Sequence, residues 1–204
     1  MTNQQLVRCG WCEGDSEYEH YHDTLWGMPV KDPQDLFAKL CLDGQQAGLS
    51  WLTILRKWDA YHALFHNFNP DALVRMPDYE REALYTNPAI IRSQAKIDAI
   101  FTNARAYLKL RDRGQDFSEF LWKFVDFEPT INAYQALSEV PTETTASRQM
   151  AKALKKEGFK FVGPTICYAF MEAVGMVNDH LIDCHRYEPC KIAMETFRLS
   201  TKRK

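Results

Sequence analysis

The sequence predicts an all-α protein of about eight or more short helices. Apolar residues recur at spacings of three and four along most of the chain, which is the period of an amphipathic helix. Residues that favour helix starts and ends bracket these runs, and no stretch alternates convincingly between apolar and polar residues. Since such helices must bury their apolar faces against one another, we expect one compact helical unit or two intimately packed lobes.

Each predicted helix has a start or stop signal beside an apolar stripe. Asp32 is a good N-cap, and Pro33 suits the first helical position. Ser50 can cap a second helix that runs on to Phe65, and Gly158 closes a later one. The segments that these signals and stripes mark as helical are 36–41, 50–65, 97–108, 118–125, 146–157 and 164–175.

Composition restricts the protein to an ordinary globular class. The 204 residues are 46% hydrophobic, and 25 Lys and Arg against 27 Asp and Glu give a net charge of −2. This excludes disorder and small secreted scaffolds, and it argues against a bulk polyanion binder, although a local basic face stays possible. No apolar run reaches the ~18 residues of a membrane span, and no secretory signal is visible, so we expect a cytoplasmic monomer. We assign 1–190 to one domain and 191–204 to a C-terminal tail that is expected to fray.

Two groups of cysteine and histidine stand near the ends of the chain. One comprises Cys9, Cys12, His20 and His22, and the other comprises His180, Cys184, His185 and Cys190. Thiolates and imidazoles suit tetrahedral zinc, and the spacing of His180 and Cys184 would place both on one face of a helical turn. Such a clip between the chain ends would be worth ~5 kcal/mol by loop entropy. Buried thiols with satisfied histidines, or a redox pair at Cys9 and Cys12, are the alternatives.

A hairpin of two helices is predicted around residues 154–168. Gly158 and Gly163 bound a tight turn, and Pro164 opens the second helix, whose positive end and free N–H groups can meet a phosphate. Nearby lysines add local positive charge, at positions 152, 155, 156 and 160. This arrangement would bind a nucleic-acid backbone without reading sequence. The alternative is an ordinary helical corner with solvated lysines.

A polar junction between helices spans residues 42–51. It contains Asp43, two glutamines, two glycines and Trp51, and Trp11, Tyr18, Tyr21 and Trp26 lie in the preceding segment. Aromatic rings around a carboxylate can hold a flat cationic ligand by stacking and charge pairing. Aromatics at helical spacing are more often core residues, so we expect Trp26 and Trp58 to be structural.

These motifs together resemble the DNA-3-methyladenine glycosylase I (Tag) family of the helix-hairpin-helix superfamily. The resemblance covers nearly the whole domain, because several unusual motifs occur in the same order. They are Arg8-Cys-Gly-Trp11, Tyr21-His-Asp-Thr-Leu-Trp-Gly27, Gly44-Gln-Gln-Ala-Gly-Leu-Ser-Trp51, Ile90-Ile-Arg92, Phe159-Lys-Phe-Val-Gly163 and Val177-Asn-Asp-His180. The resemblance implies a compact helix-hairpin-helix glycosylase-like fold in which a structural zinc site joins the N- and C-terminal segments.

The resemblance also implies specific site residues. The family's zinc ligands fall on Cys9, His22, His180 and Cys184. Its base pocket falls on Trp11, Tyr21, Trp51 and the carboxylate position Asp43, which would be catalytic. The segment inserted into the gap left by a flipped base falls on Gln46, Ala47, Gly48 and Leu49, and the DNA-anchoring hairpin residues are Lys160, Phe161 and Gly163.

Position 43 departs from the family, which usually has glutamate there. The aspartate keeps the charge but ends ~1.5 Å short of the same point, and a misplacement of about 1 Å can lower a rate on the order of 10²-fold. The backbone could advance, a water could bridge the gap, or the protein could be weakened as an enzyme. The sequence leaves these three open.

The function that the resemblance implies is hydrolysis of the N-glycosidic bond of 3-methyladenine in alkylated double-stranded DNA, with base flipping and no lyase step. In this hypothesis Asp43 pairs with the cationic base, whereas neutral adenine would leave the buried carboxylate without a cation. The alternative is a catalytically weakened, zinc-stapled helical protein that binds damaged DNA without excision. Release of free base from methylated DNA distinguishes the two.

Overall fold

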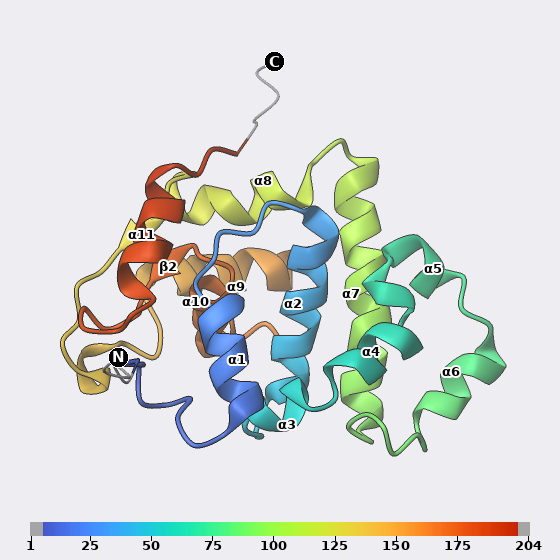
Figure 1. The fold of residues 1–204 in the computed structure, drawn as a ribbon. Helices are drawn as coiled ribbons and strands as arrows, with labels where there is room; N and C mark the ends of the chain where they lie inside the picture. Colours follow the sequence, from blue (N-terminus) through green and yellow to red (C-terminus); the bar gives the residue numbers. More distant parts are fainter. Residues whose placement is uncertain (1–5, 200–204) are drawn as a thin grey trace.

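The computed structural model describes residues 6–199 and confirms the predicted all-α class. Eleven α-helices occur in this part of the chain and enclose a core of buried apolar side chains (Figure 1). They are α1 (Ser16–Thr24), α2 (Pro33–Gln46), α3 (Trp51–Leu55), α4 (Trp58–Leu64), α5 (Pro70–Val74), α6 (Asp78–Leu84), α7 (Gln94–Asp112), α8 (Phe117–Trp122), α9 (Thr145–Glu157), α10 (Pro164–Ala173) and α11 (Tyr187–Glu195).

Short elements connect several of these helices. Three are 3-10 helices, η1 (His66–Phe68), η2 (Lys123–Val125) and η3 (Leu137–Glu139). Two are strands that pair in parallel, β1 (Thr130–Ile131) and β2 (Val177–Asn178). The sequence did not predict these strands, because a strand of two residues is too short to show a period of two. Strand β2 fixes the backbone directly before Asp179 and His180, the second of which was predicted to bind zinc.

Helix α2 occupies the centre of the molecule, with α1 on one side and α7 on the other (Figure 1). Its predicted start is confirmed, since the Asp32 carboxylate accepts hydrogen bonds from the backbone N–H groups of Gln34, at 2.8 Å, and Asp35, at 3.0 Å. Helix α2 packs against α3, α7, α8 and α10, so most of its length is buried on several faces. A polar residue on α2 therefore lies in the interior of the protein.

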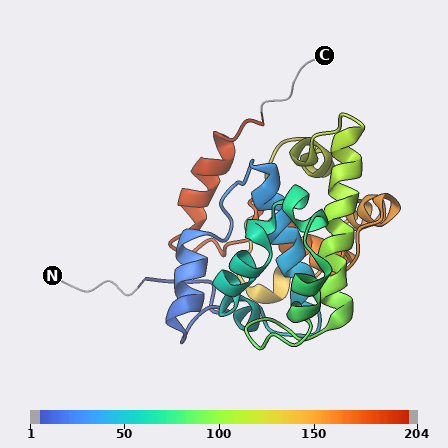
Figure 2. The same cartoon turned by 90° about the vertical axis from the view of Figure 1, so that its right-hand side faces the viewer.

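The other helices form two groups around α2. On one side α5 packs along α7, with α4 and α6 beside them (Figures 1 and 2). On the other side α10 packs against both α2 and α9, and α1 and α11 complete the outer surface. Within residues 6–199 no helix has both the length and the apolar character that a bilayer crossing needs.

The prediction of one helix from Ser50 to Phe65 is wrong, because the chain forms α3 and α4 with a break between them. Ser50 does cap α3, as predicted. The backbone leaves helical geometry at Lys57, which has φ −111° and ψ 5°, and its N–H bonds to Ile54 three residues back. The apolar stripe continues across the break because both short helices turn the same side toward the core.

The predicted domain boundary at residue 190 falls inside α11. Beyond this helix, the ring of Phe197 stacks on Trp122 with 4.1 Å between ring centroids, and Phe197 is buried. Ordered structure therefore continues past the predicted boundary as far as residue 199. Residues 200–204 of the predicted tail lie outside the described residues.

Gly175 ends α10 where the chain passes directly over another segment. Its φ is +69°, and a Cβ added there would lie 2.5 Å from the backbone N of Pro29. We expect Gly175→Ala to lower the free energy of unfolding by about 3 kcal/mol or more, because backbone strain and a backbone clash add. Gly114 is the matched control, with φ +77° and no atom within 4 Å of an added Cβ. A urea titration of both variants measures this difference, and Gly114→Ala should lower the free energy of unfolding by about 1 kcal/mol. Equal losses in the two variants would contradict an effect of the close approach to Pro29.

Candidate base pocket and Cys/His cluster

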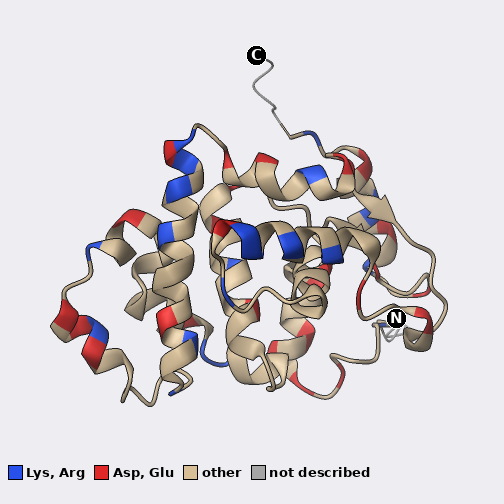
Figure 3. Cartoon of the chain, turned by 180° about the vertical axis from the view of Figure 1, so that it is seen from behind, with Lys and Arg blue, Asp and Glu red and all other residues tan. Residues whose placement is uncertain are grey.

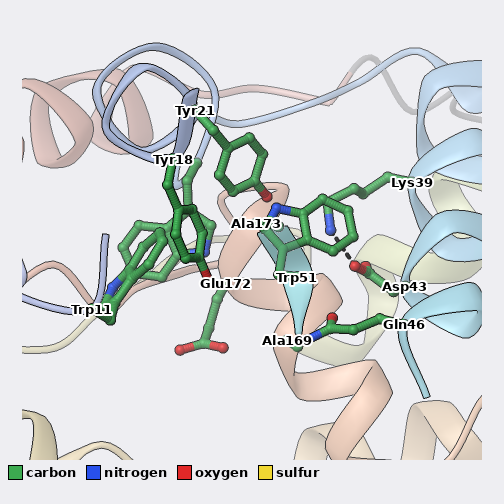
Figure 4. Close-up of a pocket in the computed structure, with 11 residues that line it drawn as sticks. Trp11, Tyr18, Tyr21, Lys39, Asp43, Gln46, Trp51, Ala169, Glu172 and Ala173 are labelled. Atoms are coloured by element: carbon green, nitrogen blue, oxygen red, sulfur yellow. Dashed lines mark hydrogen bonds and ion pairs between the residues drawn. The ribbon is translucent and has the colours of Figure 1, made fainter. Parts of the chain in front are cut away.

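A cavity of about 220 Å³ opens between α1, α2, α3 and α10. Figure 4 shows Tyr21 and Trp51 close together, with Asp43 and Lys39 beside the Trp51 ring. Of the residues predicted to bind a base, all four line this cavity: Trp11, Tyr21, Asp43 and Trp51. The cavity is also lined by Tyr18, Trp26, Lys39, Gln46, Ala169, Glu172 and Ala173. Flat aromatic side chains and a few polar groups thus line one open cavity.

The aromatic rings that line the cavity contact one another at different angles. Tyr21 and Trp51 have ring centroids 5.4 Å apart and an interplanar angle of 46°. Trp11 makes edge contacts with Tyr18, at 4.9 Å, and with Trp26, at 5.0 Å. Trp26 therefore borders the cavity as well as the core, which corrects the expectation that it is purely structural. Trp58 lies behind Trp51, with 6.3 Å between their ring centroids.

Asp43 is buried in the cavity wall with only 2% of its surface exposed. One of its oxygens, Oδ1, accepts a hydrogen bond from the ammonium of Lys39, four residues earlier on α2. Its other oxygen, Oδ2, is buried and has no hydrogen-bond partner among residues 6–199. Burial raises the pKa of Asp43, and the charge of Lys39 opposes that rise. The carboxylate therefore has one accepting oxygen in use and one unused.

Lys39 supplies a cation inside the cavity. Its ammonium lies 4.0 Å from the centroid of the Trp51 ring, and only 8% of the residue is exposed. Burial lowers the pKa of Lys39, while Asp43 acts in the opposite direction. The hypothesis that neutral adenine would leave Asp43 without a cation therefore needs correction, because the Lys39 ammonium already contacts the carboxylate. Only the aromatic neighbours of Asp43 were predicted, although Lys39 lies one helical turn before Asp43 on the same helix, a spacing at which side chains meet.

Glu172 adds a second carboxyl group to the cavity, from α10 (Figure 4). Burial raises the pKa of Glu172 well above its ordinary value, and the nearby charge of Asp179 adds to that rise. Asp179 in turn accepts hydrogen bonds from the Tyr168 hydroxyl, at 2.6 Å, and from Asn132, at 2.7 Å. In the sequence, Glu172 interrupts the apolar run 169–177, which is the signal that could have placed it in a buried site.

The segment predicted to enter the base-stacking gap joins α2 to α3. Gly48 has φ +76°, and Leu49 is 40% exposed, so the chain turns outward next to the cavity. Lys96 holds the base of this turn, because its ammonium donates to the backbone carbonyls of Gln45 and Ala47, both at 2.7 Å. An exposed apolar side chain on a braced turn is suited to insertion between bases.

The predicted hairpin forms between α9 and α10. Gly158 closes α9 with φ +99°, and Pro164 opens α10, as expected. Asn103 on α7 braces the turn, since its amide oxygen accepts from the Lys160 backbone N–H at 2.7 Å and its amide nitrogen donates to the Lys160 carbonyl at 3.2 Å. Lysines at positions 152, 155 and 156 are exposed on α9 (Figure 3).

The hairpin lies directly against the helix that carries Asp43. A Cβ added to Gly44 would lie 3.1 Å from the Cβ of Phe161 and 3.3 Å from its carbonyl oxygen. Phe161 itself has φ +54° in the turn. Three predicted features thus lie around the C-terminal half of α2. They are the hairpin predicted to bind the DNA backbone, the segment 46–49 predicted to enter the base-stacking gap, and the cavity.

Four buried side chains converge between the two ends of the chain. The ligand atoms of Cys9, His22, His180 and Cys184 all lie within 4.8 Å of one another. The Cys9 and Cys184 sulfurs lie 3.4 and 3.5 Å from His180 Nδ1, and Cys184 Sγ lies 3.5 Å from His22 Nε2. A tetrahedron with metal bonds of 2.0–2.3 Å has edges of about 3.3–3.8 Å, so this donor set fits a tetrahedral metal ion. Cys12, His20 and Cys190 are not in the cluster.

Second partners orient both histidines of the cluster. His22 Nδ1 lies 2.8 Å from Asp23 Oδ1, and His180 Nε2 lies 3.3 Å from the Trp26 carbonyl. His185 Nε2 is also 2.8 Å from Asp23 Oδ1, so this histidine supports the cluster from outside. Such partners fix the ring orientation of metal-binding histidines. His180 and Cys184 lie in a turn between β2 and α11, which corrects the prediction of a helical turn.

The buried position of Cys12 argues against the redox interpretation. Burial raises the pKa of the Cys12 thiol to about 11. A redox-active pair needs a thiol with a lowered pKa and access to solvent, whereas Cys9 and Cys12 are both fully buried.

Comparison with known proteins shows which family this chain belongs to. The family model for methyladenine glycosylase matches residues 11–187. DNA-3-methyladenine glycosylase 1 of Escherichia coli is 50% identical over 182 residues, which cover 89% of this chain and 97% of that protein. The chain belongs to the methyladenine glycosylase family.

Solved structures of this family share the fold. A crystal structure of 3-methyladenine DNA glycosylase I (TAG) has a TM-score of 0.86 and 50% identity, and the match covers 88% of this chain and 98% of that one. A Staphylococcus aureus TAG structure, described as the structural basis of 3-methyladenine recognition, has a TM-score of 0.85 and 39% identity, covering 88% and 96%. The resemblance stated from the sequence is therefore confirmed.

The residues that line this cavity without having been predicted to bind a base include Lys39, Glu172 and Trp26. Lys39 and Glu172 are charged or titratable, and Trp26 is aromatic. The i, i+4 spacing of Lys39 and Asp43 on one helix was a usable signal for their contact. The position of Glu172 depends on how α10 packs against α2, which no local pattern encodes.

Proposed function

We propose that this protein excises 3-methyladenine from alkylated double-stranded DNA by hydrolysing its N-glycosidic bond. The supporting observation is the buried carboxylate of Asp43, whose Oδ2 is free to accept a hydrogen bond beside the neighbouring rings of Tyr21 and Trp51. The family membership and the names of the relatives support the same substrate. The proposed base-binding residues are Trp11, Tyr21, Asp43 and Trp51, with Asp43 catalytic.

The chemistry follows from the charge of the lesion. Methylation at N3 leaves the adenine cationic, so the base departs as a neutral leaving group and needs little further activation. The protein must extrude the nucleotide and hold it between aromatic faces, and a damaged base lowers the unstacking penalty. Asp43 Oδ2 accepts a hydrogen bond from the base edge, and water completes the hydrolysis. We propose a monofunctional enzyme, without a covalent amine intermediate.

The DNA is held by two segments in this proposal. The exposed lysines of α9 and the hairpin at Lys160, Phe161 and Gly163 bind the phosphate backbone without reading sequence. The turn at Gln46, Ala47, Gly48 and Leu49 fills the space left by the extruded base. Both segments contact α2, so backbone binding and base extrusion occur around the same helix.

The Cys9, His22, His180 and Cys184 cluster is proposed to bind zinc with a structural role. All four donors are protein side chains, which leaves no open position of the kind that catalytic zinc sites keep. When bound, the metal would supply a cross-link between the two ends of the chain. The chain's own residues carry the reaction in the separate cavity.

Incubation with methylated duplex DNA tests the function. We expect free 3-methyladenine, identified by chromatography, and abasic sites that break only after alkali treatment. DNA binding without base release would support instead a weakened protein that binds damage without excision. Strand breakage before alkali treatment would contradict the monofunctional mechanism.

A further inference from the structure

The cavity contains a positively charged side chain, Lys39, at the position where the proposed function places the positive charge of the substrate base. The ammonium of Lys39 contacts Asp43 Oδ1 and lies 4.0 Å from the Trp51 ring centroid. A carboxylate and an aromatic face are the two features that attract a cationic base. Both are therefore already in contact with a positive group before any ligand enters.

The charges around Lys39 show how this affects ligand binding. Asp43 on α2 and Glu172 on α10 are the carboxyl groups lining the cavity, and Tyr18 and Tyr21 on α1 are its phenols. Burial raises the pKa of Glu172 and of Tyr21, which favours their neutral forms. Of the two carboxyl groups, Asp43 is the one whose oxygen accepts a hydrogen bond from the Lys39 ammonium, so Lys39 compensates its charge. A second cation enters a site whose charge is already compensated.

We infer that Lys39 is a specificity-determining residue that competes with a positively charged base for Asp43 and the Trp51 ring. The inference rests on the proposed function, because it concerns binding of the substrate class named there. A cationic base must displace the Lys39 ammonium or share one carboxylate with it, and two like charges at one buried carboxylate repel. A neutral purine meets no such repulsion and can still donate to Asp43 Oδ2.

Two purine probes separate charge from shape. The first is 3,9-dimethyladeninium, whose positive charge is permanent and whose N9 methyl group stands for the sugar. The second is 3-methyladenine, which is neutral at pH 8. Binding is followed by tryptophan fluorescence, since Trp11, Trp26 and Trp51 line the cavity. All titrations are run at pH 8.

The key variant is Lys39→Met, which removes the charge and keeps an unbranched apolar stem. We expect it to bind 3,9-dimethyladeninium at least tenfold more tightly than the unaltered protein, with the affinity for 3-methyladenine changed less than threefold. Lys39→Arg is the matched control and should resemble the unaltered protein for both probes. Lys39→Gln, which can still donate a hydrogen bond to Asp43, replaces Lys39→Met if circular dichroism shows that the latter is unfolded.

Three outcomes would overturn the inference. Unchanged affinity for the cation would show that Lys39 does not compete. Weaker binding of the cation alone would mean that Lys39 serves to keep Asp43 charged, and an equal loss for both probes would mean that it is only structural. Release of 3-methyladenine from DNA is measured on the unaltered protein in parallel. Failure of that release refutes the proposed function, whereas release without a gain in Lys39→Met refutes only the competition.

Discussion

Replacement of Asp43 by asparagine is expected to lower the release of 3-methyladenine from DNA at least about 10²-fold in kcat/KM. Asparagine has nearly the same size, but it removes the charge and one of the two accepting oxygens. The free oxygen Oδ2 is the group proposed to accept from the base. Asp43 has a lysine ammonium hydrogen-bonded to it, which opposes the rise in its pKa that burial causes, whereas the pKa of Glu172 lies well above its ordinary value.

The fold should survive this substitution. The partner left behind is Lys39, and burial already lowers the pKa of that lysine, so it can lose its proton rather than remain an unpaired buried charge. Binding to undamaged DNA should change less than about threefold in a gel-shift titration, since the lysines of α9 and the hairpin lie outside the cavity.

Asp43→Glu is the matched control for charge. It keeps the carboxylate and supplies the side chain that the family usually has, so we expect excision within tenfold of the unaltered protein. Wild-type excision by Asp43→Asn would remove Asp43 from the mechanism. Equal losses in Asp43→Asn and Asp43→Glu would mean that packing at this position, rather than charge, sets the rate.

Loss of the metal is expected to destabilise the protein by about 5 kcal/mol, by the loop-entropy estimate for a link that encloses more than 100 residues. For a domain of this size that corresponds to a fall in Tm of about 10–20 °C. The link joins Cys9 and His22 to His180 and Cys184, whose donor atoms already have tetrahedral spacing. Chelation and the variant Cys9→Ser should give the same fall.

Cys12→Ser is the matched control for the metal site. Cys12 is as fully buried as Cys9 but is not one of the four converging residues. It should keep one zinc per chain by elemental analysis and lose only about 1–3 kcal/mol, the penalty of burying a hydroxyl. A purified chain that contains no zinc, or a Tm that chelation leaves unchanged, would contradict the proposed site.

Local signals in the sequence were sufficient for helices with strong ends. Asp32 and Pro33 predicted the start of α2, and Gly158 predicted the end of α9, because capping depends on residues next to each other. The break between α3 and α4 was missed, since both helices present apolar residues to the core and the stripe does not show the change at Lys57.

The site was predictable to different degrees. Spacing alone left eight possible metal ligands, and the resemblance to the family selected the four that the structure brings together. Asp43 and its aromatic neighbours were found in the same way. Glu172 was not found, because it belongs to no motif and its place at the cavity depends on how α10 packs against α2. Lys39 was not found either, although its spacing of four residues from Asp43 on one helix was a usable signal.

The absence of a side chain at Gly44 sets how closely the hairpin turn approaches α2, and in the proposed function this determines where a bound duplex lies relative to the cavity. Phe161 approaches this residue so closely that the hairpin turn rests on the backbone next to Asp43. If that turn binds a phosphate as proposed, we expect the phosphate to lie at a constant distance from the Asp43 carboxylate, whichever nucleotides flank the lesion. In this proposal, a side chain at position 44 would push the hairpin turn away from α2 and so increase the distance between the phosphate and Asp43. The extruded nucleotide would then enter the cavity less deeply, although the hairpin turn and the cavity themselves would be unchanged.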